Sequence, residues 1–372
     1  MEKHGKKILI FSREFPPFVG GAGSAAFEYA KLLSNEANIH VTVLTEYIEG
    51  IEGKCSFKFD IKRMPSSKFL PGVLRFIKFK EFINYDLIIL NDSSSIFFAG
   101  LFFSKKLLSK CICFFHGSEP ERIYMSPNVF RRVIGYEKFY SRAINHCIKR
   151  VAVSKYMRKK MLTVDKLSGL VIDVDYTPIG NVDSVNEVDV DTKFIFNKIK
   201  NKRIYITASR LVRGKGHERV LNSLIELKKL GCLNWHWLVV GDGEYLNEFR
   251  TLVEESEVSR FVTFLGKVDR SCLNAIYSKS SCMILLSEFK ESFGLVYLEA
   301  NLAGIPSIGF NRYGAKEAIV NGQTGFLVNN ENELVRILLE ERYVYLSKHD
   351  MYGYAKSFDG SQFINKVREL IY

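Results

Sequence analysis

The sequence predicts an α/β protein with two doubly wound, parallel-sheet domains that face each other across a cleft. Short apolar strands alternate with helical patterns along the first half, and this alternation restarts after the polar stretch 181–202. Continuous apolar strands separated by helices are typical of a parallel sheet covered on both faces. The length of 372 residues also favours two domains over one.

Each predicted strand is a short apolar run. Those of the first half are Ile8–Phe11, Val41–Leu44, Asp86–Leu90, Cys111–Phe115 and Val151–Val153, with a first helix over about 24–35. Those of the second half are Arg203–Ala208, Trp235–Val240, Val262–Phe264, Cys282–Leu286 and Pro306–Gly309, separated by helices such as Glu218–Leu230, Leu246–Glu254 and Arg270–Ser278. We therefore expect an N-terminal domain over 1–182, a C-terminal domain over 183–357, and a helix within 358–372 that packs back on the first domain.

The composition is that of a soluble globular protein, with 47% hydrophobic and 25% charged residues. The cysteines form no C-x-x-C pair and lie mostly in apolar runs, which indicates reduced thiols in a cytoplasmic protein. The beginning of the chain lacks the layout of a signal peptide, and no apolar stretch is long enough to span a membrane.

The net charge of +12 lies mainly in residues 1–180. Within 131–160 a single acidic residue, Glu137, accompanies Arg131, Arg132, Lys138, Arg142, Lys149, Arg150, Lys155, Arg158, Lys159 and Lys160. Aromatic residues such as Phe130 and Tyr140 are interspersed, so this region is a candidate surface for anionic lipid at the inner face of the membrane. A solvated helix face is the alternative, and no nucleic-acid recognition motif is present.

In doubly wound sheets, ligands bind beyond the carboxyl ends of the strands. The candidate functional residues follow predicted strands in this way: Gly20, Gly21, Asp92, His116, Ser154, Arg210, Gly241, Ser287 and Glu291. Their shared position carries more weight than any single motif.

Arg210 and Lys215 lie five residues apart in a glycine-containing loop after a strand. Two cations at such a place suit a diphosphate whose charge grows as it leaves. Two solvated basic residues are the alternative, and the position at the strand end favours a diphosphate site.

Glu291 and Glu299 flank a loop that turns into a helix at Gly294. The glycine lets a backbone approach a ligand closely, and free amides at the helix start would point at an anion. An anion site flanked by carboxylates that accept hydroxyl groups indicates a sugar joined to a phosphate. A solvated pair of glutamates is the alternative.

The loop with Gly20 and Gly21 lacks the G-x-G-x-x-G spacing, and no acidic residue ends the second strand, so nicotinamide binding is disfavoured. A backbone platform for phosphate or sugar fits better than a plain helix-entry loop. His116 ends a buried strand, where a histidine can bind a sugar hydroxyl or serve a structural purpose. Metal-ligand spacings are absent, and Asp173-Val174-Asp175 lies in a strand-like run, so we expect neither a metal nor a cofactor.

Together these segments resemble retaining glycosyltransferases of family 4, which have the GT-B architecture of two Rossmann-like domains. The matching segments are Gly20-Gly21, Phe115-His116-Gly117, Val153-Ser154-Lys155, Ser209-Arg210, Lys215-Gly216, Val240-Gly241-Asp242-Gly243, Phe264-Leu265-Gly266, the pair Glu291 and Glu299, and Asn321-Gly322-Gln323-Thr324-Gly325-Phe326-Leu327. The family's P-N-G-V-D link is Pro178-Ile179-Gly180-Asn181-Val182-Asp183 here, with Gly and Asn exchanged.

The resemblance implies a role for each matching residue. In the donor site, Arg210 and Lys215 would hold the diphosphate. Glu299 would bind the ribose and Glu291 the hydroxyl groups of the sugar. The other donor contacts would be Phe293, Gly294 and Leu295 next to Glu291, Gly241 in the neighbouring glycine loop, and Lys267 near the base. His116 would lie beside the reacting sugar and Gly20 and Gly21 near phosphate or acceptor, while Asp92 and Ser154 are candidate acceptor contacts. We count His116, Glu291, Arg210 and Lys215 as the catalytic set.

The resemblance implies transfer of a hexose or N-acetylhexosamine, from a UDP-sugar or from GDP-mannose, to a lipid-linked saccharide in lipopolysaccharide, O-antigen or capsule synthesis. A GT-B sugar-nucleotide epimerase and a non-catalytic nucleotide-sugar binding protein are the alternatives.

Overall fold

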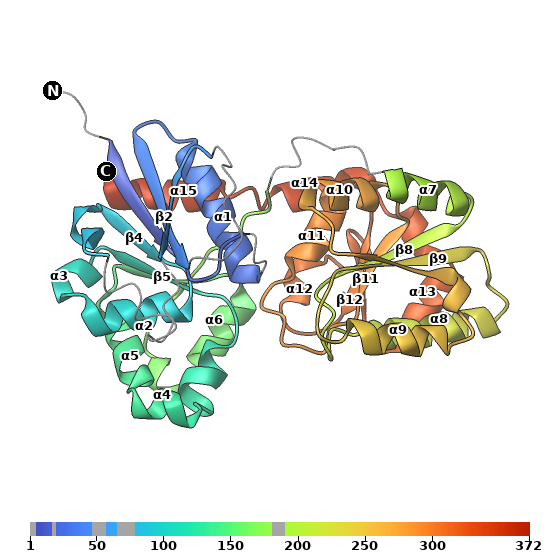
Figure 1. The fold of residues 1–372 in the computed structure, drawn as a ribbon, viewed down its shortest axis with the longest axis horizontal. Helices are drawn as coiled ribbons and strands as arrows, with labels where there is room; N and C mark the ends of the chain where they lie inside the picture. Colours follow the sequence, from blue (N-terminus) through green and yellow to red (C-terminus); the bar gives the residue numbers. More distant parts are fainter. Residues whose placement is uncertain (1–4, 17–19, 47–56, 65–78, 181–189) are drawn as a thin grey trace. The chain divides into compact units, whose positions relative to one another are not determined.

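The computed structural model describes residues 5–16, 20–46, 57–64, 79–180 and 190–372 (Figure 1). The chain divides into two compact units. Unit 1 is Met1–Pro178 with Gly360–Tyr372, and unit 2 is Ile179–Asp359. The domain boundary expected at 182–183, with Asn181-Val182-Asp183 of the link, lies outside the described residues.

Unit 1 contains a seven-stranded parallel sheet of order β3-β2-β1-β4-β5-β6-β7. Its strands are β1 (Lys6–Phe11), β2 (Ile39–Glu46), β3 (Asp60–Met64), β4 (Leu87–Leu90), β5 (Cys111–Phe115), β6 (Lys149–Ala152) and β7 (Asp173–Val174). Its α-helices are α1 (Gly21–Ser34), α2 (Ser93–Phe102), α3 (Lys105–Leu108), α4 (Val129–Val133), α5 (Tyr136–His146), α6 (Lys155–Leu162) and α15 (Ser361–Ile371).

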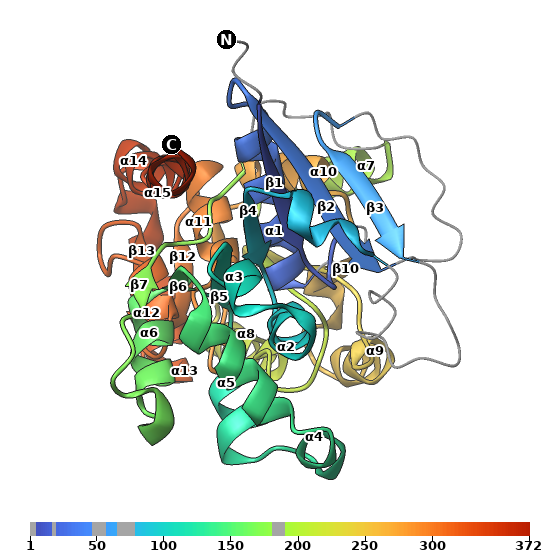
Figure 2. The same ribbon diagram turned by 90° about the vertical axis from the view of Figure 1, so that its left-hand side faces the viewer.

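Helices cover both faces of the unit 1 sheet. Phe11 on β1 stacks edge-on against Phe98 of α2, whereas Phe114 on β5 contacts Tyr29 of α1 and Phe363 of α15. Strand register aligns Phe11, through β4, with the residue before Phe114, so these two rings point to opposite faces. Helices α1 and α15 therefore share one face, and α2 lies on the other together with α5, which it contacts closely (Figure 2).

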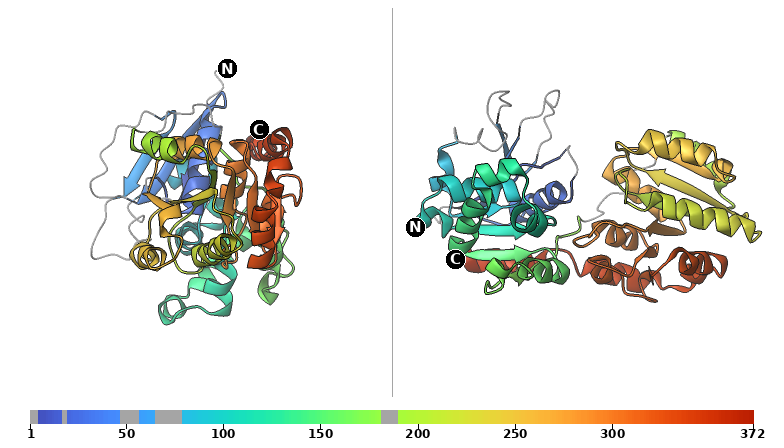
Figure 3. Two further views of the ribbon diagram at one scale, coloured as in Figure 1. Left: turned by 90° about the vertical axis from the view of Figure 1, so that its right-hand side faces the viewer. Right: turned by 90° about the horizontal axis from the view of Figure 1, so that it is seen from below.

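Unit 2 contains a six-stranded parallel sheet of order β10-β9-β8-β11-β12-β13. Its strands are β8 (Arg203–Ala208), β9 (Trp235–Val240), β10 (Val262–Gly266), β11 (Cys282–Leu285), β12 (Ser307–Phe310) and β13 (Gly325–Val328). Its α-helices are α7 (Val190–Ile199), α8 (His217–Lys229), α9 (Leu246–Glu254), α10 (Arg270–Ser278), α11 (Leu295–Leu302), α12 (Ala315–Ala318), α13 (Glu331–Leu339) and α14 (Lys348–Lys356). Helix α8 contacts α13, and α11 contacts α14, so that helices flank this sheet as well (Figure 3).

The predicted fold class is confirmed, and every strand named from the sequence is present within two residues of its expected bounds. Strands β3 and β13 were not predicted as strands. Helix α15 buries Phe363, Ile364 and Val367 in the unit 1 core, which joins the end of the chain to its first half.

Candidate functional site

In unit 2, the loop after β8 and the loop after β11 lie against each other. The backbone N–H of Glu288 donates a hydrogen bond of 2.8 Å to the carbonyl oxygen of Gly214. At Gly216, φ is 84°, and a Cβ would lie 2.0 Å from the carbonyl oxygen of Leu286. Only glycine allows this approach. The loop predicted to bind diphosphate is therefore fixed to the loop predicted to bind sugar.

Lys215 and Glu291 meet where these two loops join. Lys215 Nζ lies 2.6 Å from Glu291 Oε1, and Ser287 Oγ donates to the same oxygen at 2.7 Å. The two side chains are only 16% and 20% exposed, which strengthens their attraction over that of a surface pair. The sequence predicted separate duties for the cation and the carboxylate, and the structure adds that they form one charge-compensated centre.

Arg210 begins the same loop and is exposed. In the part of the chain that the structure describes, its guanidinium makes no hydrogen bond or ion pair, while its carbonyl oxygen accepts from the N–H of Val212 at 3.1 Å. A guanidinium presented in this way can take two oxygens of a phosphate or carboxylate at once.

Gly294 converts the second loop into helix α11. Its φ is 102°, and a Cβ there would lie 2.6 Å from the ring of Tyr297. Phe293 is buried before it, and α11 begins at Leu295, as the sequence predicted. Glu299 lies further along this helix and is half-buried. Its role toward a ribose stays a prediction.

The loops after β9 and β10 adjoin the same edge. Gly241 donates its N–H to the carbonyl oxygen of Gly266 at 2.8 Å, and a Cβ on Gly241 would lie 1.9 Å from the carbonyl oxygen of Ser209. Lys267 follows β10 directly and is exposed. Since β10, β9, β8 and β11 are neighbours in the sheet, the predicted donor residues of unit 2 gather at the carboxyl ends of adjacent strands.

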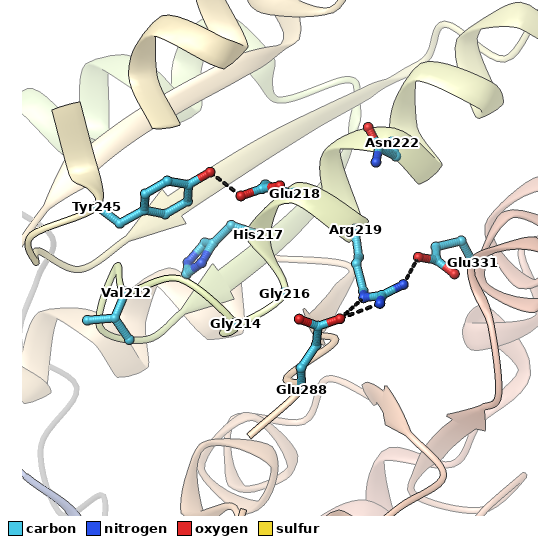
Figure 4. A pocket seen from close by; sticks show the side chains of 10 residues that line it. All are labelled: Val212, Gly214, Gly216, His217, Glu218, Arg219, Asn222, Tyr245, Glu288 and Glu331. Atoms are coloured by element: carbon cyan, nitrogen blue, oxygen red, sulfur yellow. Dashed lines mark hydrogen bonds and ion pairs between the residues drawn. The ribbon is translucent and has the colours of Figure 1, made fainter. Parts of the chain in front are cut away.

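A cavity of about 210 Å³ lies beside the loop after β8 (Figure 4). It is lined by Val212, Gly214, Gly216, His217, Glu218, Arg219, Asn222, Tyr245, Glu288 and Glu331. Three of these are carboxylates, and Arg219 is already paired with two of them, so the lining does not suit a diphosphate.

In unit 1, His116 follows β5 and lies beside Asn91, which follows β4 and is fully buried. The side-chain amide nitrogen of Asn91 donates to the carbonyl oxygen of Ala22 at 2.8 Å and to Ser12 Oγ at 3.0 Å, so Asn91 Oδ1 faces His116. Because Oδ1 can only accept, His116 Nε2, 3.1 Å away, carries the proton and Nδ1 keeps a lone pair.

Burial lowers the pKa of His116 to about 4, against a smaller opposite effect of the hydrogen bond with Asn91. The imidazole is therefore neutral near pH 7. A neutral ring with one free lone pair can accept a hydrogen bond from a hydroxyl group.

The His116–Gly117 turn is held by the buried carboxylate of Glu119. Glu119 accepts from the N–H of His116 at 2.9 Å and from that of Gly117 at 2.7 Å, and burial raises its pKa. Lys160 donates to the carbonyl oxygen of Gly117 at 2.6 Å. Sequence reasoning missed both Asn91 and Glu119 as partners of His116. The only signal was that Glu119 follows His116 by three residues.

The other unit 1 candidates lie at helix starts. Gly20 precedes α1, and Gly21 has open space where a Cβ would project, which suits a backbone platform. Asp92 caps α2 by accepting from the N–H groups of Ser94 and Ser95, both at 2.8 Å, and Ser154 caps α6. These capping bonds occupy groups that the sequence suggested for the acceptor, and that role stays a prediction.

Within the described ranges, no cluster of three or more histidine, cysteine, aspartate or glutamate side chains could hold a metal ion. The Asp173-Val174 pair forms strand β7.

Two family models match the chain. Residues 19–171 match the model described as Glycosyltransferase Family 4, and residues 189–357 match Glycosyl transferases group 1. Among relatives, the chain is 22% identical over 358 residues to the GDP-mannose-dependent alpha-(1-6)-phosphatidylinositol monomannoside mannosyltransferase of Mycobacterium tuberculosis, covering 88% of this chain and 86% of that protein.

Among solved structures, the Anabaena protein HepE in complex with UDP-glucose is similar with a TM-score of 0.75 and 19% identity, covering 98% of each chain. WaaG, a glycosyltransferase involved in lipopolysaccharide biosynthesis, is similar with a TM-score of 0.64 and 15% identity, covering 95% of this chain and 94% of that one. At such identities the likeness establishes the fold, which is GT-B.

Proposed function

Because the chain belongs to glycosyltransferase family 4 and is a transferase enzyme, we propose that it transfers a hexose or N-acetylhexosamine with retention of anomeric configuration. The donor is a nucleotide-diphosphate sugar, with a UDP-sugar favoured and GDP-mannose as the second choice. The acceptor is a hydroxyl of a lipid-linked saccharide in the synthesis of a cell-surface polysaccharide such as lipopolysaccharide, O-antigen or capsule.

The observation that carries this proposal is the Lys215–Glu291 centre, whose Lys215 shares a loop with the exposed Arg210. A donor diphosphate would bind Arg210 and compete with Glu291 for Lys215. Glu291 would keep its hydrogen bond from Ser287 and gain oxygen lone pairs for the hydroxyls of the sugar. Recognition of the phosphate and of the sugar would thus be linked through one ion pair.

In the proposed reaction the bond between the sugar C1 and the diphosphate oxygen breaks, and a bond from C1 to the acceptor oxygen forms on the same face. The proton of the acceptor hydroxyl passes to an oxygen of the departing diphosphate. Arg210 and Lys215 stabilise the charge that develops there, so we expect no metal ion. Neutral His116 would accept a hydrogen bond from a sugar hydroxyl through Nδ1.

The donor is tested by thermal unfolding of the protein with UDP, GDP, UDP-glucose, UDP-N-acetylglucosamine and GDP-mannose, since a bound ligand stabilises the native state. HepE was solved with UDP-glucose and the mycobacterial relative is GDP-mannose-dependent, so both nucleotide classes belong in the panel. The stabilising donor is then incubated with and without a lipid-linked saccharide.

Transfer only in the presence of acceptor, with an α-linked product from an α-linked donor by NMR, supports the proposal. Conversion of the donor alone into an isomeric nucleotide sugar would instead indicate an epimerase. Binding without turnover under either condition would indicate a nucleotide-sugar binding protein.

A second part of the proposal concerns an anionic membrane surface in the basic region 131–160, and it is supported by helix α4. This helix has no buried residue, and Val129, Phe130 and Val133 are 76%, 58% and 79% exposed. Arg131 and Arg132 lie between them. Figures 1 and 2 both show α4 at an end of unit 1 away from the sheet. Exposed apolar side chains interspersed with cations suit the headgroup region of an anionic bilayer.

Among the described residues, no helix combines the length and the hydropathy needed to cross a bilayer. The exposed apolar and basic side chains of α4 lead us to propose peripheral attachment at the inner face of the cytoplasmic membrane, with the acceptor presented by the same membrane surface.

Vesicle sedimentation tests the attachment. The protein should bind phosphatidylglycerol vesicles more than phosphatidylcholine vesicles, and Phe130→Ser with Arg131→Ser should abolish the difference. Val171→Ser is the matched control for the apolar side chain, since Val171 is 77% exposed in the same unit but outside helix α4. Equal binding of the wild type to both vesicles would remove the electrostatic argument.

A further inference from the structure

Arg219 on α8 joins the donor loops to the helices behind them (Figure 4). Its Nε donates to Glu288 Oε1 at 2.6 Å, and its Nη2 donates to the same oxygen. Its Nη1 donates to Glu331, the first residue of α13. One guanidinium therefore binds two carboxylates that lie 43 residues apart in the sequence, as their residue numbers show.

The two helices that supply this network are firm supports. Helix α8 contacts α13, and both bury apolar side chains in the unit 2 core. Glu288, by contrast, belongs to the loop after β11. Its side chain is fixed by Arg219 and its backbone N–H by the carbonyl oxygen of Gly214.

Glu288 thus connects the supporting helices to the donor centre. Gly214 is the residue before Lys215, and Glu288 is three residues before Glu291. Lys215 and Glu291 are in turn joined to each other by their 2.6 Å ion pair. A displacement of Glu288 would move both residues that we assign to the donor.

Stability alone is a weak explanation for this network. The side chains of Arg219, Glu288 and Glu331 are 37%, 42% and 31% exposed, and ion pairs at such exposed positions contribute little to stability. Arg203 and Glu341 form a comparable pair, 45% and 38% exposed, at the opposite end of β8.

We propose that Arg219 is a positioning residue, which holds the loop of Lys215 and the loop of Glu291 in the arrangement that binds the nucleoside diphosphate of the donor. The inference rests on the proposed function and deepens it, because it adds a residue outside the donor contacts. Arg219 acts through Glu288 and touches neither phosphate nor sugar.

Calorimetric titration with UDP and with GDP tests the inference. For the nucleotide that the wild type binds, Arg219→Ala should raise Kd by about tenfold, because small misplacements of binding groups are costly. Arg203→Ala, the matched control, should stay within about twofold while losing similar thermal stability. Arg219→Lys keeps the charge but lacks the planar fork, so we expect an intermediate loss.

A double-mutant cycle separates positioning from a general structural effect. If Arg219 acts through Glu288, the variant with both Arg219→Ala and Glu288→Ala should bind no more weakly than Arg219→Ala alone. Should Arg219→Ala fail to fold, Glu331→Gln breaks one arm of the network and should weaken binding to a smaller degree.

Unchanged affinity in Arg219→Ala, equal weakening in Arg203→Ala, or additive losses in the cycle would each overturn the inference and leave the proposed function standing. A wild-type protein that binds neither UDP nor GDP would overturn the proposed function, and this inference with it.

Discussion

In each unit the candidate site lies at the carboxyl ends of the strands, but the two sites are held together by different interactions. In unit 2, the Lys215–Glu291 ion pair and the exposed guanidinium of Arg210 make a site of formal charges. In unit 1, neutral His116 is held by Asn91, and its turn is held by the buried carboxyl group of Glu119.

This difference follows from which side chains can be buried without keeping a charge. An imidazole can lose its charge on burial, so His116 stays neutral while it bonds Asn91. A guanidinium cannot lose its charge, so Arg210 stays exposed. Lys215 is half-buried, and it forms an ion pair with Glu291 that compensates its charge. The Lys215–Glu291 centre is thus suited to a charged ligand, and the imidazole of His116 to a neutral hydroxyl group.

Removal of the unit 2 cations tests this contrast most strongly. Arg210→Ala or Lys215→Ala should lower the transfer rate by about 10²–10³-fold, because each removes a group that stabilises the departing diphosphate. Lys228→Ala is the matched control, since Lys228 pairs with Glu257 away from the loops. The measurement is kcat with saturating donor, and wild-type turnover in Arg210→Ala or Lys215→Ala would refute the charge-based view of unit 2.

The close approach of the two unit 2 loops gives the next largest effect. Gly216→Ala should destabilise more than Gly231→Ala, although both glycines have φ near 84°. The left-handed backbone costs alanine about 1–2 kcal/mol at either position. Only at Gly216 would the Cβ also meet the carbonyl oxygen of Leu286, which adds about 1–3 kcal/mol.

Urea unfolding measures this difference, and activity assays should show a loss for Gly216→Ala alone. If the two variants lost the same stability, the loops would be separable and the unit 2 site would not depend on their contact.

Much of the fold could be predicted from sequence because buried parallel strands are local signals. Strands β5 and β8 were predicted with their observed bounds, since each is a short apolar run that ends at a polar loop. Strand β3 lies at the edge of its sheet and contains Asp60, Lys62 and Arg63, so it lacks that signal. Its place depends on pairing with β2, which the sequence does not encode locally.

The candidate site was predictable to the level of strand ends and no further. Lys215 and Glu291 are 76 residues apart, and His116 and Asn91 are 25 apart. Rules for parallel sheets place each of them at one edge. The contacts between them depend on which loops adjoin and on side-chain packing, which only the folded chain determines.

The smallest expected effect is a difference in acid sensitivity between the units. Burial lowers the pKa of His217 and His236 in unit 2 to about 4 each, as it does for His116 in unit 1. Nδ1 of His217 and Nδ1 of His236 are buried without a hydrogen-bond partner among the described residues. Because unfolded histidines titrate near 6.5, the unfolded state binds more protons below that pH, and stability is lost as pH falls from about 6.5 toward 4.

Unit 1 has an opposing contribution. Burial raises the pKa of Asp92, Glu119 and Asp175, so the folded state binds more protons than the unfolded state at these carboxyl groups as pH falls toward their raised pKa values. This contribution has the opposite sign to the loss from His116, whereas the losses from His217 and His236 have the same sign and add, each on the order of 1 kcal/mol at pH 5. Hydrogen exchange at pH 7 and pH 5, corrected for intrinsic rates, should show a greater loss of protection in β8 and β9 than in β4 and β5. His236→Gln should reduce the loss in unit 2, because glutamine does not titrate. Equal losses of protection in the two units of the wild type would contradict the opposing contributions of the carboxyl groups and the histidines in unit 1.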